Sequence, residues 1–409
     1  MRLGAFTHTT LLSNNVLCMT NYIKQQQTMP SNSDQLSSRI SLAHSTDQVV
    51  KRADWRFLLD NPLPQRSIVF EDGLLAKAVS MISESTSVYP VQYKPGIYDL
   101  AVAVNPSEEL LRDASLALRP GGNCYIEWRV NHFFNASTIV NRLKAIGFTN
   151  IRLYLPKPEP HDIYTNLWIP ITGKSAVEFM LVENLQTETK NKPLRIAKFV
   201  RYLLWKKNPG LFLKYPFLIG SRRKYTIVSI ASKSASSTTT DMSRETIAIP
   251  EDGERNVNLF SVIKSTLRKE WKNLGLSAQP EKISKIMLCN KGSKDKIMFY
   301  VFTDKHPTPS MVVKIPRIKN QISPIHKEAQ NLKSIHTAFK DLKGIPKVLF
   351  IIDEEKMFAQ GQSYADGAPL SSIIDESNRR DLSLAMTWWL VELARNTSSP
   401  ASHDWKKSL

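Results

Sequence analysis

The chain has 409 residues, with 55 Lys and Arg against 37 Asp and Glu, so its formal net charge is +18. This length leaves room for two or three domains, and a hydrophobic content of 42% with 22% charged residues is typical of a globular protein. Three widely spaced cysteines, Cys18, Cys124 and Cys289, exclude a disulfide framework and a cysteine metal site. Such sparse cysteines favour a reducing compartment, so we expect a cytoplasmic location.

The first 47 residues differ in composition from the rest of the chain. They are rich in Ser, Thr, Asn and Gln and contain no acidic residue before Asp34. This composition predicts a disordered leader over 1–47. Two alternatives stay open, an organelle transit peptide and an extension upstream of an internal start at Met29.

From Trp55 onward, strand and helix patterns alternate. Apolar runs predict strands over 67–71, 98–104, 123–128 and 150–155. Helical periodicity between them predicts helices over 73–83, 106–118 and 136–146. Strands that alternate with helices indicate an α/β domain with a parallel sheet.

Several of these stretches resemble one family. YDLAVAV at 98–104, LRPGGNCYIEW at 118–128 and KAIGFTNIRLY at 144–154 are similar to the second half of a class I S-adenosylmethionine-dependent methyltransferase. They correspond to its fourth strand, its fifth strand with the preceding turn, and its last helix with the sixth strand. RRKYTIVSIAS at 222–232 would be its closing antiparallel strand. The resemblance covers about 55–232 and implies a Rossmann-like sheet.

The first half of this domain departs from the family pattern. A glycine-rich turn should follow the first strand so that backbone amides can approach the cofactor, but Glu71 and Asp72 are followed by the single glycine Gly73. The 26 residues between Asp72 and Asp99 are too few for two more strand–helix units. We therefore expect a truncated sheet that no longer binds S-adenosylmethionine.

Most of the excess positive charge lies in one window. Residues 189–240 contain no Asp or Glu. Within them, apolar residues at helical spacing predict an amphipathic helix in an insertion over 189–221. The basic residues of the window are Lys190, Lys192, Arg195, Lys198, Arg201, Lys206, Lys207, Lys214, Arg222, Arg223, Lys224 and Lys233.

Three interpretations of this window stay open. The helix could dock on the sheet with a solvated basic rim, or 189–224 could bind an anionic membrane surface. The third is a polyanionic ligand, of which nucleic acid is the least favoured because no nucleic-acid-binding motif is present. The polar, Ser- and Thr-rich residues 233–256 then predict a linker.

The second half of the chain predicts strands over 283–289, 297–303 and 311–315, a helix over 326–339, strands over 345–350 and 357–360, and a helix over 382–396. Lys314 lies in the third strand and Glu328 on the helix that follows. A lysine on a strand and a carboxylate on the next helix can form a phosphate-binding pocket. The alternative is an ordinary surface lysine and a helix-face glutamate.

VVKIP at 312–316, KEAQNL at 327–332 and GAPL at 367–370 resemble the N-terminal lobe of the aminoglycoside-phosphotransferase (kinase-like) family over about 257–396. The resemblance implies that ATP with magnesium is the cofactor and that Lys314 contacts its phosphates. It also implies that Glu328 pairs with Lys314 and that the backbone near Ala359 and Gln360 meets adenine. The family's catalytic aspartate and metal ligand would come later, so we expect no catalytic residue and no metal site in this chain.

The sequence thus predicts a truncated Rossmann-like methyltransferase sheet (α/β) over 48–232, a linker, an α+β kinase-like N-lobe over 257–396 and a tail over 397–409. Our main hypothesis is a fragment of a phosphotransferase-like protein that acts on a small hydroxylated substrate, such as a sugar, behind a pseudo-methyltransferase front domain. One alternative is a non-catalytic interaction protein at a membrane surface. A second alternative is an active S-adenosylmethionine-dependent methyltransferase.

Overall fold

A computed structural model describes residues 46–90, 92–131, 135–158, 167–171, 173–186, 192–210, 224–234, 259–289, 296–303, 306–318, 322–338, 344–354, 357–365 and 374–397. The predicted leader, linker and tail lie almost wholly outside these residues, as does GAPL at 367–370. None of the described helices is both long and apolar enough to cross a membrane.

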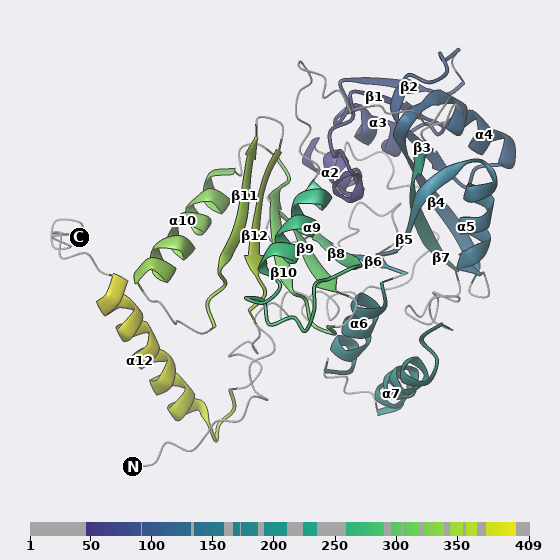
Figure 1. Cartoon of the computed structure of the whole chain (residues 1–409). Coiled ribbons are helices and arrows are strands. Elements are labelled where there is room, and N and C mark those ends of the chain that lie inside the picture. The colour runs from purple at the N-terminus through teal and green to yellow at the C-terminus, as the bar shows by residue number, and fades with distance from the viewer. Residues whose placement is uncertain are drawn as a thin grey trace, which may run out of the picture.

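The described strands form one sheet in the order β11-β12-β10-β9-β8-β6-β5-β7-β4-β3-β1-β2. Figure 1 shows it running through the molecule from the green strands to the blue ones. The strands are β1 (Arg66–Val69), β2 (Ser85–Val88), β3 (Tyr98–Val104), β4 (Leu118–Asn131), β5 (Phe148–Lys157), β6 (Leu167–Pro170), β7 (Lys224–Lys233), β8 (Ile283–Cys289), β9 (Lys296–Thr303), β10 (Met311–Pro316), β11 (Val348–Glu354) and β12 (Met357–Ser363).

The first half of the sheet has the strand order of a Rossmann-like methyltransferase. Strands β2, β1, β3 and β4 are parallel, and β7 lies antiparallel between β4 and β5. The predicted fourth, fifth, closing and sixth strands therefore lie side by side as β3, β4, β7 and β5. The described residues between Asp72 and Asp99 form one helix and one strand, fewer than the two strand–helix units of the family pattern.

The second half continues the same sheet. Strand β8 pairs with β6, with Leu167 opposite Leu288 and Trp168 opposite Met287. The antiparallel strands β8 to β12 extend the α/β sheet from there, so the prediction of a kinase-like lobe set apart by a linker is not what the strand pairing shows. The local pattern did not reveal this because it defines strands and not the edges along which they pair.

Helices cover both faces of the sheet (Figure 1). Side chains of α4, α5, α6 and α7 belong to the core on one face, and those of α2, η1, α3 and α9 to the core on the other. Helix α10 lies beside β10 to β12, while the side chains of α12 are almost all exposed. The helices are α2 (Thr46–Lys51), η1 (Asp54–Leu58, a 3₁₀ helix), α3 (Leu74–Ser80), α4 (Glu108–Ala117), α5 (Ala136–Ala145), α6 (Lys174–Gln186), α7 (Lys192–Lys207), α9 (Leu259–Glu270), α10 (Ile322–Ala338) and α12 (Arg379–Thr397).

Local sequence explains the ends of the helices near the parallel strands. Ser107 caps α4 by accepting a hydrogen bond from the backbone N–H of Leu110 at 3.1 Å. Asn135 caps α5 in the same way, through the N–H of Ser137. Two residues beyond the end of α5, Gly147 has a φ of 92°, the left-handed conformation that glycine favours after a helix. These caps fix where each helix leaves the sheet.

Candidate functional site

The parallel strands end at one edge of the sheet, where the turns after β1 and β3 lie next to the end of β4. The chain runs from β1 outward to β2 and then crosses back to β3 on the other side of β1. In open α/β sheets, ligands bind outside the carboxyl ends of the strands at such a reversal of strand order. We call this place the carboxyl-edge site, formed by Arg52, Glu71, Asn105, Glu127 and Arg129.

Asn105 fixes the turn after β3 to the end of β4. Its φ of 44° places it in the left-handed region, which asparagine tolerates better than most residues. Its backbone N–H donates to the carbonyl oxygen of Glu127 at 2.8 Å, and its Oδ1 accepts from the N–H of Arg129 at 2.6 Å. The turn is therefore held rigidly beside the site.

A buried ion pair lies below this turn. Arg52, which follows α2, donates from Nη2 to Glu127 Oε1 at 2.5 Å, and the hydroxyl of Tyr125 donates to the same oxygen at 2.7 Å. Burial, and then the negative charge of Glu127, raises the pKa of Tyr125 well above its usual value, so this hydroxyl stays a donor. Trp55 stacks on Tyr125 with ring centroids 3.8 Å apart. The negative charge of Glu127 is thus compensated by the positive charge of Arg52.

Glu71 is one of two acidic side chains in the turn after β1, and it is the less exposed of the two, since the neighbouring Asp72 is exposed. Glu71 is half-buried, and its carboxylate makes no hydrogen bond with the other described residues. Partial burial raises its pKa, and the negative Glu127 raises it further, while Arg52 and Arg129 act in the opposite direction. Gly73, with a φ of 91°, turns the chain after Glu71, and a Cβ placed there would meet nothing within 4 Å. The turn is therefore open to solvent or to a ligand.

The structure brings Lys314 and Glu328 together in an ion pair between β10 and α10. The Lys314 side chain is 10% exposed and that of Glu328 is 36% exposed. Burial lowers the pKa of Lys314; the bond to Glu328 opposes this, and the positive Lys296 adds to it. Gln360 lies opposite Lys314 in the β10–β12 pairing, and Gln360 and Ala359 are fully buried. Cofactor binding by these four residues stays a prediction.

Sequence reasoning did not single out most of the carboxyl-edge site. Glu71 lies in the turn that the sequence identified, but Asn105, Glu127 and Arg52 were missed. Asn105 directly follows a predicted strand and Glu127 lies near the end of another, so their positions could have indicated them. Nothing in the pattern points to Arg52, because it reaches the site from a short segment before the first strand.

A scan against models of known protein families found no match, and a search of curated proteins found none either. Solved structures that the chain resembles include phosphoethanolamine N-methyltransferase 2 of Haemonchus contortus, in complex with S-adenosylhomocysteine (TM-score 0.22, 15% identity, 46% of this chain and 58% of that chain) and with S-adenosylmethionine (0.23, 14%, 51% and 61%). A third is an S-adenosylmethionine-dependent methyltransferase of Thermotoga maritima (0.24, 10%, 53% and 98%). The chain spans about three fifths of the Haemonchus structures. Because these scores are low, the case for the fold rests on the strand order itself.

These findings correct the assignment to a kinase-like family. None of the solved structures that the comparison names is a kinase, and most are methyltransferases. The phosphotransferase function and the ATP–magnesium cofactor are therefore wrong predictions. Physically, the strand carrying Lys314 belongs to the extension of the methyltransferase-like sheet, and a lysine paired with a glutamate on the next helix needs no nucleotide to account for it.

They also correct the prediction that S-adenosylmethionine binding is lost. The Haemonchus structures of this class are complexes with S-adenosylmethionine or its product. The prediction relied on the missing glycines, but Gly73 alone makes the turn after β1, and the space beside it is open. The turn can therefore form without a glycine-rich sequence.

Proposed function

We propose that the protein is an S-adenosylmethionine-dependent methyltransferase whose cofactor binds at the carboxyl-edge site. The observation that carries this proposal is the strand order β2-β1-β3-β4-β7-β5, with its reversal between β1 and β3. Bound there, S-adenosylmethionine would supply an electrophilic methyl group. The substrate would approach from the same edge of the sheet.

The residues at this edge fit the polar part of the cofactor. Glu71 offers a carboxylate free to accept hydrogen bonds from an ammonium group or from ribose hydroxyls. The Asn105 turn is already bonded to β4, so it would hold its position while a ligand binds. The buried Arg52–Glu127 pair fixes the floor of the site without adding net charge. Glu71 is therefore the residue we assign to cofactor binding.

Calorimetric titration with S-adenosylhomocysteine tests this assignment. We expect the full chain to bind one equivalent, and Glu71→Gln to weaken binding about tenfold or more, the effect of losing hydrogen bonds to a charged group. Glu84→Gln serves as the matched control because Glu84 is exposed just before β2, at the opposite end of the parallel strands from the site. No binding by the wild type, or equal binding by Glu71→Gln, would contradict the proposal.

We also propose that helix α7 holds the protein at an anionic membrane surface. One face of α7 exposes Phe199 (52%), Val200 (47%), Leu203 (44%) and Leu204 (43%). The opposite face is anchored, since Trp205 is 1% exposed within the core. The exposed face therefore lies on a helix whose position is fixed by the fold.

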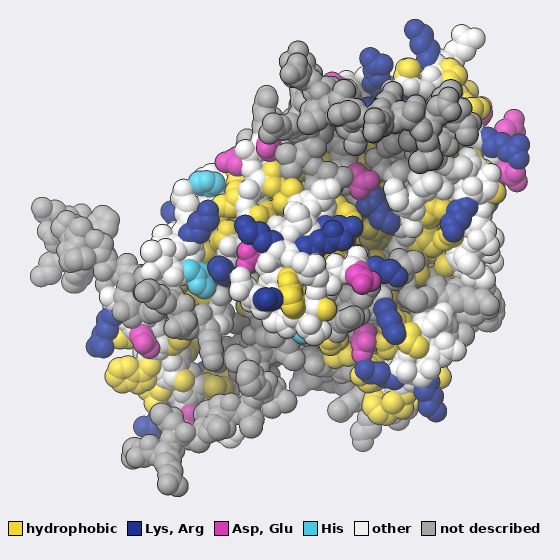
Figure 2. Space-filling view, in the orientation of Figure 1, with side chains coloured by type: hydrophobic (Ala, Val, Ile, Leu, Met, Phe, Trp, Pro, Cys, Tyr) yellow, Lys and Arg dark blue, Asp and Glu magenta, His cyan; other side chains and the backbone are white. Residues whose placement is uncertain are grey.

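Charge supports this reading of α7. The absence of Asp and Glu throughout 189–240 leaves basic side chains as the charged groups of the helix and its flanks. Lys206 is bonded to Glu178 of α6 at 2.6 Å, and Lys207 is exposed. Figure 2 shows hydrophobic and basic side chains together at the lower right, where Figure 1 places α7. Apolar groups beside basic ones are what an anionic lipid interface binds.

Vesicle flotation tests the membrane proposal. We expect the protein to float with vesicles of phosphatidylcholine and phosphatidylserine at low salt, and less with phosphatidylcholine alone. Phe199→Glu with Leu203→Glu should abolish flotation. Leu116→Glu should not, because Leu116 is an equally exposed apolar residue (57%) on α4. Flotation unchanged by the α7 variant, or absent from the wild type, would overturn the proposal.

A further inference from the structure

A pocket of about 290 Å³ lies between the segments that follow η1 and α3 in the first half of the chain and the strands β10 and β12 of the second half. We call it the seam pocket. The first half contributes Phe57, Leu63 and Ile82 to its walls, and the second half contributes Ile315, Met357 and Phe358. Apolar side chains thus line it from both sides.

The rim of the seam pocket is also apolar. Leu63 is 37% exposed, Met81 39% and Ile318 43%, and all three line the opening. Large apolar side chains that stay exposed around a pocket are typical of a ligand-binding site. The ligand of this pocket should therefore have a hydrocarbon body.

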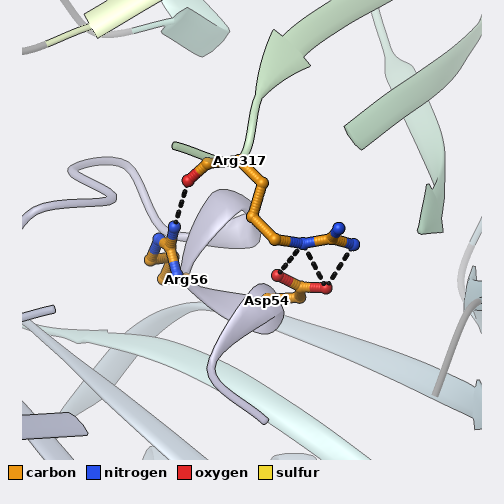
Figure 3. A network of polar contacts seen from close by, with 3 residues as sticks. All are labelled: Asp54, Arg56 and Arg317. Carbon is orange, nitrogen blue, oxygen red and sulfur yellow. Dashed lines mark hydrogen bonds and ion pairs between the residues drawn. The ribbon is translucent and has the colours of Figure 1, made fainter. Parts of the chain in front are cut away.

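One polar group in the wall lacks a full set of partners. Arg56, on η1, is 4% exposed, and its guanidinium lies over the ring of Phe57, 4.4 Å from the centroid. Its Nη2 donates to the carbonyl oxygen of Arg317 at 2.9 Å, whereas Nε and Nη1 have no hydrogen-bond partner in the described part of the chain. Figure 3 shows the bond from Arg56 to that carbonyl oxygen. A buried cation with unused donors is normally paired.

The neighbouring charges do not neutralise Arg56. Arg317 forms a two-pronged ion pair with Asp54, from Nε and Nη2, with contacts of 2.9 to 3.2 Å (Figure 3). Asp54 is thereby committed to Arg317. Burial lowers the pKa of Arg56 to about 10; Asp54 opposes this change, and the positive Arg317 adds to it. Glu354 also lines the pocket, but it is exposed and solvated at the mouth. Among the described residues, one positive charge in the wall is therefore left without a compensating negative charge.

We propose that the seam pocket binds a small apolar monoanion, a carboxylate on a hydrocarbon chain, with its carboxylate next to the buried Arg56. The uncompensated positive charge of Arg56 in the wall would attract the carboxylate, and the apolar walls accept the chain. A dianion such as phosphate would leave a second negative charge buried and unpaired. A sugar would leave hydroxyls facing apolar walls. Since both halves line the pocket, the ligand would contact both. This inference is independent of the proposed methyltransferase function.

Calorimetric titration with octanoate tests the proposal, with 1-octanol as the uncharged probe and acetate as the probe without a chain. We expect octanoate to bind about tenfold more tightly than 1-octanol, and acetate not to bind measurably. Arg56→Met should remove the preference for octanoate and leave 1-octanol binding unchanged. Arg112→Met, at an exposed arginine of α4, should behave as the wild type.

A second variant tests the proposal even if Arg56→Met does not fold. Leu63→Trp, at the partly exposed rim, fills the pocket without touching the buried charges and should abolish binding of octanoate and 1-octanol alike. Failure of the wild type to bind octanoate, equal binding of octanoate and 1-octanol, or full octanoate binding by Leu63→Trp would each overturn the proposal. Retained binding of S-adenosylhomocysteine in either variant would show that the carboxyl-edge site is unaffected.

Discussion

Lys285 shows how far a single buried charge can influence this fold. It is 5% exposed on β8, with Nζ 4.8 Å from the ring centroid of Phe299 and 5.5 Å from that of Phe260. Burial lowers its pKa to about 7; the positive Arg152 adds to this, and Asp60 opposes it. The folded protein therefore favours the neutral amine, while the unfolded chain keeps the ordinary pKa near 10.5.

This difference predicts a pH dependence of stability. Between pH 7 and about 10.5 the unfolded state binds the proton and the folded state does not, so the free energy of unfolding should rise with pH, by at most about 1.4 kcal/mol per unit from this group. Below pH 7 the cost of burying the charge is fully present. Lys285→Met should remove this contribution and stabilise the protein most at low pH, as urea unfolding at several pH values would show.

Lys282→Met is the control for Lys285→Met, because Lys282 is an exposed lysine just before the same strand. That variant should follow the wild-type pH profile. Parallel profiles for Lys285→Met and the wild type would mean that Lys285 is not held neutral by the fold.

At the scale of elements, sequence patterns predicted the strands whose apolar runs are buried on both faces. The strands at 98–104 and 283–289 have the predicted bounds. Strand β2 (STSV) was missed because it is polar and lies at the sheet edge, and β6 (LWIP) because four residues ending in proline form no clear pattern. Helix α6 was missed because its apolar residues are spread around the helix instead of along one face.

The candidate site, too, was predicted from the sequence only in part. The sequence identified the turn containing Glu71 because the family pattern draws attention to it, and it predicted that Lys314 pairs with Glu328. It could not show that Arg52 reaches Glu127, because that contact joins residues 75 positions apart. Nor could it show that β8 pairs with β6, and this missing contact led to the wrong assignment of the second half.

A substitution at one glycine tests the close packing at the junction of β6 and β8. A Cβ on Gly173, just after β6, would lie 2.6 Å from the Cβ of Ser284 on β8. Gly173→Ala should therefore destabilise the protein by about 1–3 kcal/mol, the usual cost of overpacking, measured by urea unfolding. Adding Ser284→Gly should restore stability. Gly210→Ala is the control, since its nearest neighbour is 3.4 Å away; an equal effect at both glycines would refute the tight junction.

At the scale of the whole molecule, the continuous sheet predicts that the two halves unfold together. Both core clusters contain residues from each half, and the Arg317–Asp54 pair joins residues 263 positions apart. Arg317→Met would leave Asp54 buried and unpaired, at a cost of about 3–5 kcal/mol.

Pulse-labelling mass spectrometry in urea can follow the peptides over 98–104 and 296–303 separately. We expect one common midpoint in the wild type and an equal decrease for both peptides in Arg317→Met. Arg268→Met, at an exposed arginine of α9, should change neither. Two separate transitions in the wild type would contradict a single cooperative sheet, and would favour the predicted boundary between 48–232 and 257–396.

The central claim is that the carboxyl edge of the parallel strands binds S-adenosylmethionine. Hydrogen–deuterium exchange with and without S-adenosylhomocysteine tests it most directly, because it shows where the ligand lies as well as whether it binds. The account predicts slower exchange in the turns at 70–74 and 104–107, with β8 unchanged. Unchanged exchange in both turns at saturating ligand would contradict it.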